Sequence, residues 1–70
     1  MTKGKTFTFD IGKSYTFGIE NVEVKGTVTQ IEEDVVFLTD AYEYSRTNSH
    51  LRYLGTVPVL REEVRWIKYA

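Results

Sequence analysis

Hydrophobic and polar residues alternate along most of this chain. In the first third, apolar side chains occupy the odd positions over 7–11 and again over 15–19, with Thr, Ser or Asp at most of the even positions. A period of two is typical of a strand with one buried face, and threonine suits the exposed face. Turns are expected at 10–13 and 18–21, where glycine interrupts the pattern.

The segment 22–31 alternates in the same way but contains a glycine. Val22, Val24 and Val28 share one side with Gly26, and by Ile31 the apolar side has switched. Glycine inside a strand usually marks a sharp bend or a close approach of backbone, and a switch of side is what a bulge causes. A bent and bulged strand is typical of a small barrel.

The second half of the chain predicts three more strands. A polar break at 32–34 precedes an apolar run over 35–44, odd positions are apolar again over 51–59, and the segment 64–69 closes the chain. Pro58 cannot donate to a ladder, so it predicts an edge or a bulge. No apolar period of 3.6 extends over ten residues. The pattern therefore predicts one all-β domain over residues 1–70, with five strongly bent strands.

Composition limits what can stabilise such a domain. A chain of 70 residues buries only about 60% of the surface that its unfolded form exposes, so its core is marginal. It has no cysteine and one histidine, which excludes disulfides, thiolate metal sites and a His-rich zinc site. Self-association is the remaining stabilising device, and we expect no metal or cofactor. Because no apolar run reaches about 18 residues, we expect a cytoplasmic protein without a membrane span.

Charge is distributed unevenly although the net charge is −1. Residues 20–43 carry seven acids against Lys25, whereas residues 44–70 carry five basic residues against Glu62 and Glu63. The near-neutral total argues against a bulk basic surface for nucleic acid. Such unevenness also occurs in domains where it has no role in binding.

Two groups of residues follow the motifs of a known family. GKSYTF at 12–17, KGTV at 25–28 and LTDA at 38–41 match its first motif, and LGTVPVLREEVRWI at 54–67 keeps the apolar and glycine positions of the second. The kept positions are Leu54, Gly55, Val57, Val59, Val64 and Ile67. In this order of features the chain resembles the Sm-like family, the small RNA-associated ring proteins that include the LSm proteins and bacterial Hfq.

The resemblance implies both a fold and an assembly. The fold is a small, strongly bent, five-stranded SH3-like open barrel, and in the family the fourth strand of one subunit pairs with the fifth strand of its neighbour to close a homo-oligomeric ring. The implied function is binding of RNA or single-stranded DNA, with a role in RNA or DNA processing. The alternative is a non-catalytic oligomeric protein-interaction module built on an SH3-like barrel.

The sequence departs from the family in three places. The turn at 32–34 is shortened to Glu-Glu-Asp and lacks the asparagine that contacts a base, and the Arg-Gly pair of the base pocket is replaced by Leu60-Arg61. The family's N-terminal helix is replaced by TFTFDI at 6–11, which predicts a strand or an extended arm. These departures put the family's uridine pocket in doubt, while fold and ring assembly remain expected.

The last strand is the expected assembly interface. Its residues are apolar on both faces, and we expect a chain this small to be unable to cover both of them. An exposed apolar edge aggregates unless another strand pairs with it. The predicted interface residues are Val64, Trp66, Ile67 and Tyr69. The alternative is a monomeric barrel with Trp66 in its core.

The stretch 41–55 is the candidate nucleic-acid surface. It combines aromatic and basic residues, which bind single strands by stacking and by pairing with phosphates. The candidate residues are Tyr44, Arg46, His50, Arg52 and Tyr53, together with Arg61 at the turn where the family holds its base. The alternative is a plain hairpin whose tyrosines shield the barrel end. No catalytic residue is predicted, because adjacent strand residues in Glu32-Glu33-Asp34 point to opposite faces and no acid orients His50.

Overall fold

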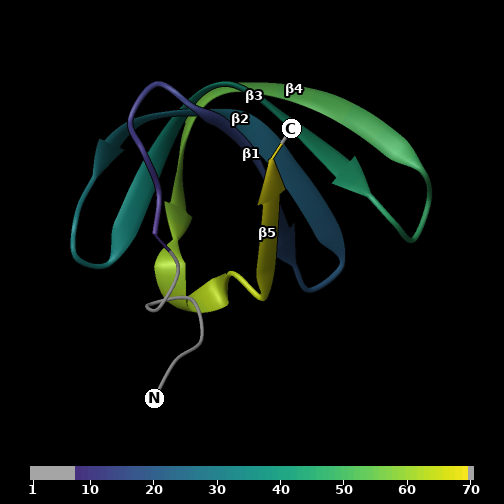
Figure 1. Cartoon of the computed structure of the whole chain (residues 1–70). Coiled ribbons are helices and arrows are strands. Elements are labelled where there is room, and N and C mark those ends of the chain that lie inside the picture. Colours follow the sequence, from purple (N-terminus) through teal and green to yellow (C-terminus); the bar gives the residue numbers. More distant parts are fainter. Residues whose placement is uncertain (1–7, 70) are drawn as a thin grey trace.

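Five antiparallel strands make up nearly all of the structure, a computed structural model that describes residues 8–69 (Figure 1). The elements are β1 (Ser14–Ile19), β2 (Val22–Ile31), β3 (Val35–Ser45), β4 (His50–Leu60), the 3₁₀ turn η2 (Arg61–Glu63) and β5 (Trp66–Tyr69). The predicted all-β, five-stranded fold is confirmed. Within the described residues no helix is long and apolar enough to cross a bilayer.

The strands form one curled sheet in the order β4-β3-β2-β1-β5. In Figure 1, β2, β3 and β4 arch over β5, and the β3–β4 hairpin extends to the side opposite η2. The register between β2 and β3 shifts at 25–27 and at 28–30, and that between β3 and β4 shifts near residue 41. Each shift is a bulge or irregularity that adds bend and twist. The bulge predicted between residues 26 and 31 is therefore confirmed.

Gly26 lies at the first of these shifts, where the backbone of β2 lies close to side chains of β3. A Cβ atom on Gly26 would lie 3.1 Å from the Cβ of Leu38 and 3.2 Å from the Cβ of Ala41. Both neighbours are fully buried, so neither has free space to move into. Only glycine at this position lets the backbone of β2 lie this close to Leu38 and Ala41 without displacing β3.

The core fills the inner side of the curled sheet. Its buried side chains come from every strand except β5, from the segment before β1, and from the segment between η2 and β5. They are Phe9, Tyr15, Phe17, Val24, Val28, Val36, Leu38, Ala41, Val59 and Val64.

The segment before β1 is an arm, not a strand, in the part that the structure describes. Residues 8–10 form no ladder, and a turn follows in which the Lys13 N–H donates to the Asp10 carbonyl at 3.2 Å. Phe9 is buried against Tyr15 and Phe17, with ring centroids 5.6 and 5.3 Å away. Of the two predicted alternatives, a strand or an extended arm, the structure shows the arm over residues 8–11, with Phe9 anchored in the core. Positions 6 and 7 lie outside the described residues.

Gly26→Val should destabilise the fold by about 1–3 kcal/mol, because the added methyl groups overpack the contact with Leu38 and Ala41. The free energy of unfolding in urea measures the effect. Lys25→Val, one residue away and exposed, is the matched control and should change stability much less. Equal stability of Gly26→Val and the parent chain would contradict the close packing of β2 on β3.

Candidate assembly edges and nucleic-acid interface

The two edges of the sheet are β4 and β5. Among the described residues, β4 pairs with β3 alone and β5 with β1 alone, so each strand leaves one side of its backbone unpaired. Pro58, opposite Phe37, lies in β4, and this confirms the prediction of an edge or a bulge at that point. The molecule therefore presents two unpaired strand edges.

β5 uses both of its faces within the subunit. Ile67 lies opposite Phe17 and packs against the core, while Trp66 lies opposite Gly18 on the other face. A Cβ atom on Gly18 would lie 2.1 Å from Cε2 of Trp66, so the indole rests directly on the glycine backbone. Trp66 and Ile67 are half-buried, so the subunit covers each face of its last strand only in part, and the expectation that it cannot cover both faces stays a prediction.

The predicted interface residues therefore lie in three environments: Val64 is buried, Trp66 and Ile67 are half-buried, and Tyr69 is exposed. Val64 precedes β5 and is 2% exposed in the subunit's own core, so its side chain is not available to a partner, and its assignment to the interface is wrong. Tyr69 is 72% exposed and stacks on Tyr15 at 5.4 Å. On the opposite edge, β4 exposes Leu51, Tyr53 and Leu60. The exposed apolar surface of the edges thus lies at Tyr69 on β5 and along β4.

The β3–β4 hairpin places four apolar side chains on one face. Tyr42 lies opposite Tyr53, with ring centroids 5.1 Å apart in an edge-to-face arrangement, and Tyr44 lies opposite Leu51. All four are exposed. Of the predicted binding residues, Tyr44 and Tyr53 therefore share a surface. Tyr42 and Leu51 belong to the same surface and follow from the hairpin register.

A hollow of about 400 Å³ adjoins these tyrosines. Its lining includes Thr16 of β1, Lys25 of β2, Asp40 and both tyrosines of β3. Asp40 has a φ of +52°, a conformation that is uncommon for residues other than glycine. Its carboxylate accepts a hydrogen bond from the Tyr53 hydroxyl at 3.4 Å. Desolvation, and then the charge of Asp40, raise the pKa of Tyr53 above its ordinary value of 10.0, so the hydroxyl stays protonated and remains a donor.

Arg52 lies on the other face of the hairpin. It alternates with Leu51 and Tyr53 along β4, and it lies opposite Glu43, to which it is ion-paired at 3.2 Å. Its guanidinium therefore points away from the exposed tyrosines. The predicted pairing of Arg52 with a phosphate next to Tyr53 would require a different rotamer and loss of that ion pair.

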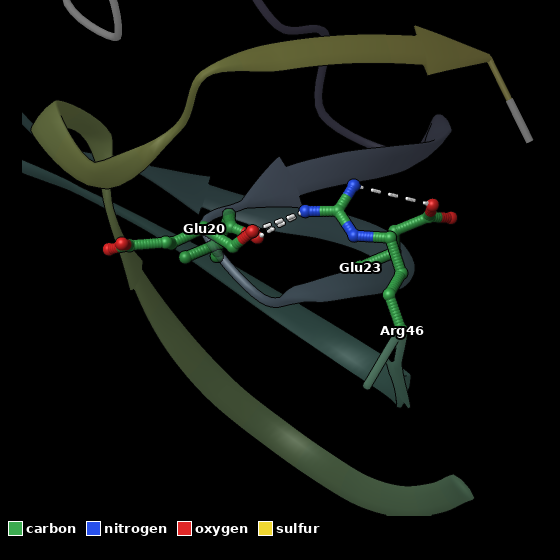
Figure 2. A network of polar contacts seen from close by, with 4 residues as sticks. Glu20, Glu23 and Arg46 are labelled. Carbon is green, nitrogen blue, oxygen red and sulfur yellow. Dashed lines mark hydrogen bonds and ion pairs between the residues drawn. The ribbon is translucent and has the colours of Figure 1, made fainter. Parts of the chain in front are cut away.

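Arg46 joins two hairpins (Figure 2). Its Nη2 donates to the carbonyls of Ile19, at 3.2 Å, and Glu20, and its Nη1 lies 3.7 Å from the Glu23 carboxylate. Its backbone N–H donates to the Asn21 carbonyl at 3.0 Å. The guanidinium thus donates hydrogen bonds to the carbonyls of the turn between β1 and β2. Arg46 is therefore a structural residue.

The remaining two candidates lie at the hairpin end and at η2. His50 is exposed at the hairpin end, where its backbone N–H donates to Oδ1 of Asn48 at 3.1 Å. Arg61 begins η2, and its side chain donates to the Glu32 carbonyl at 3.3 Å and lies 5.5 Å from the centroid of the Phe9 ring. The six predicted binding residues therefore do not converge on one site.

The end of the barrel around Arg61 is acidic. The Arg61 N–H donates to the Asp34 carbonyl at 2.9 Å, which brings η2 against the turn between β2 and β3. The two segments that meet here, 32–34 and 61–63, carry five acids and one arginine; the acids are Glu32, Glu33, Asp34, Glu62 and Glu63. A field of this sign repels phosphate.

Three solved structures show what fold this is. The chain aligns to a heptameric archaeal Sm protein with 24% identity and a TM-score of 0.72, over 86% of this chain and 88% of that one. It aligns equally to the P. aerophilum SmAP1 heptamer, with 24% identity and a TM-score of 0.72, over 86% and 81%. A chain of the NatC complex bound to Gag peptide and CoA gives 22% identity and a TM-score of 0.75, over 86% and 84%.

These likenesses establish an Sm-like fold and confirm the fold predicted from the motifs. No protein-family model and no curated protein sequence matches the chain. One fold can carry unrelated functions, so the function of this chain has to be argued from its own surfaces.

Arg46→Ala should lower the free energy of unfolding by about 1 kcal/mol, because it leaves turn carbonyls without their charged donor. Arg46→Lys should not restore stability, since a lysine ammonium cannot contact the turn carbonyls and the Glu23 carboxylate at the same time. Arg52→Ala removes one exposed ion pair and is the control, with an expected loss of no more than about 0.5 kcal/mol. Equal losses for Arg46→Ala and Arg52→Ala in urea denaturation would contradict the structural role of Arg46.

Proposed function

We propose that the chain is a subunit of a homo-oligomeric Sm-like ring that binds single-stranded nucleic acid, RNA in the first place. The observation that carries the proposal is the pair of unpaired edges, β4 and β5, in a chain with the fold of archaeal Sm heptamers. The proposed activity is binding without catalysis.

The edges support assembly on physical grounds. Unpaired edges pair with other chains unless they are blocked, and this subunit also exposes Leu60 and Tyr69 along them. Pairing of β4 with β5 of another copy joins two different surfaces, and such a head-to-tail contact closes into a ring when the rotation between copies permits it. Each subunit then has no unpaired edge.

The exposed tyrosines support nucleic-acid binding. Tyr42, Tyr44 and Tyr53 present aromatic faces without a partner from the core, and stacking on such side chains is how proteins bind single strands without reading sequence. The acidic end around Arg61 is unsuited to phosphate. We therefore place the contact on the tyrosine face and not at the turns that form the family's base pocket.

A second function is favoured by the ion pairs. Arg46 and Arg52 are both paired with glutamates, which leaves the tyrosine face less cationic than a typical nucleic-acid surface. An aromatic surface without strong charge is also the composition of a protein-binding patch. Salt separates the two functions, because only nucleic-acid binding should weaken steeply as salt is raised.

Leu60→Lys in β4 and Tyr69→Lys in β5 should each reduce the mass of the assembly in sedimentation, because each places a charge in the proposed strand pairing. Both side chains are exposed in the subunit, so its fold should persist and the circular dichroism should stay unchanged.

Ile11→Lys is the matched control, because Ile11 is 64% exposed but lies in the turn before β1 and on neither edge. It should keep the parent mass. A parent chain that sediments as a monomer, or edge variants that retain the parent mass, would contradict assembly through β4 and β5.

A further inference from the structure

Two rows of residues cross the whole sheet in register. The first row runs from β5 to β4 through every strand, and its members are Lys68, Thr16, Lys25, Tyr42 and Tyr53. The second row runs beside it and consists of Trp66, Gly18, Glu23, Tyr44 and Leu51. Residues from positions 16 to 68 are thereby brought onto one surface.

Both rows lie on the outer face of the sheet. Along β1, Thr16 and Gly18 alternate with Tyr15 and Phe17, whose side chains fill the core on the inner face. The 400 Å³ hollow is lined by Thr16, Lys25 and Tyr42 together, which confirms that these side chains share one side. With strands about 4.8 Å apart, each row is about 19 Å long.

The first row holds both lysines together with Tyr42 and Tyr53, and the second row holds Trp66 and Tyr44 but no cation. The ammonium of Lys68 lies 5.7 Å from the centroid of the Trp66 ring, and Lys25 lies directly opposite Tyr42. The acids on this face are already engaged: Glu23 is paired with Arg46 at 3.7 Å and Asp40 accepts the Tyr53 hydroxyl.

The outer face therefore carries Lys25 and Lys68 against the charge of Asp40, because Arg46 offsets the charge of Glu23. The turn η2, at the acidic end, lies on the other side of the molecule from the tip of the β3–β4 hairpin (Figure 1). A strand of phosphates is therefore repelled from the barrel end and attracted by the two lysines.

We infer that single-stranded nucleic acid lies along these rows, with bases stacked on Tyr42, Tyr44 and Tyr53 and phosphates held by Lys25 and Lys68. The inference deepens the proposed function and rests on it. Exposed aromatic residues on a sheet face, with cations between them, are the chemistry of single-strand binding. Because each row ends at the edges β4 and β5, pairing of those edges between copies joins the rows of neighbouring subunits into one track.

The test uses the intact assembly and fluorescein-labelled oligo(U) and oligo(dT) of about 16 nucleotides, the upper end of the site sizes of a small barrel domain. Fluorescence anisotropy gives the affinity at several salt concentrations. Tyr42→Leu and Tyr53→Leu should each weaken binding by about 5- to 150-fold through loss of stacking. Lys25→Gln and Lys68→Gln should each make the slope of log affinity against log salt shallower by about 0.7.

Two further measurements keep the result interpretable. Lys13→Gln removes an exposed lysine from the turn before β1, off both rows, and should leave the slope unchanged. Trp66 is the only tryptophan of the chain and lies at the β5 end of the second row, so its fluorescence should be quenched when the oligonucleotide binds. Circular dichroism and sedimentation of each variant confirm an intact assembly.

The other outcomes overturn the inference in distinguishable ways. If the face variants bind normally and Arg61→Ala loses binding, the outer face is not the site, although the proposed function stands. If Lys13→Gln alters the slope as much as Lys25→Gln, attraction to net charge explains the binding and the rows do not. If neither oligonucleotide binds at low salt, the proposed function fails together with the inference, and the protein-interaction module becomes the better account.

Discussion

The close approach of β2 to β3 at Gly26 is the contact on which the rest of the structure depends. Because no side chain separates Gly26 from Leu38 and Ala41, the sheet bends there and wraps five strands around ten buried side chains. The curl does not bring β4 and β5 of one subunit together, so a sheet tight enough to form a core in a chain of this size still has two unpaired edges. The two unpaired edges are thus a consequence of the same bend that makes the core.

The charged residues divide the surface of the barrel into an acidic end and an outer face that carries lysines. Acids concentrate where η2 meets the turn between β2 and β3, and Arg61 there is held by backbone carbonyls and by Phe9. The arginines of the hairpin are used for internal contacts. Lys25 and Lys68 on the outer face are the lysines in register with Tyr42 and Tyr53. A chain with almost no net charge can therefore have an acidic end and a face that carries lysines.

Local pattern was sufficient to predict much of the fold. Alternation predicted the strands, and the position of Gly26 and the switch of parity before Ile31 predicted the bend and the bulge. Val64 was assigned to the interface because its place in the last apolar segment does not show that it precedes β5 and turns into the core. Phe9 follows the alternation of a strand, but residues 8–10 form no ladder, and the Phe9 ring is buried against Tyr15 and Phe17 instead.

The candidate site could be predicted only in part, because it depends on contacts between distant segments. The stretch 41–55 was rightly seen as rich in exposed aromatic residues. The role of Arg46 depends on the β1–β2 turn lying beside it, 26 residues away in sequence. Lys25 and Lys68 join the tyrosine surface only through the register of five strands. A pattern along one strand carries no information about register across the sheet.

Backbone hydrogen exchange tests the central claim, pairing of β4 with β5 between copies, most directly. Outward-facing amides of an unpaired edge exchange rapidly, whereas amides of a paired strand are protected. The outward-facing amides of β4 and β5 should be protected at high protein concentration and lose protection on dilution, while amides of β2, paired on both sides, stay protected throughout. Exchange of these outward-facing amides that is fast at every concentration, or protection of them that does not depend on concentration, would contradict the pairing.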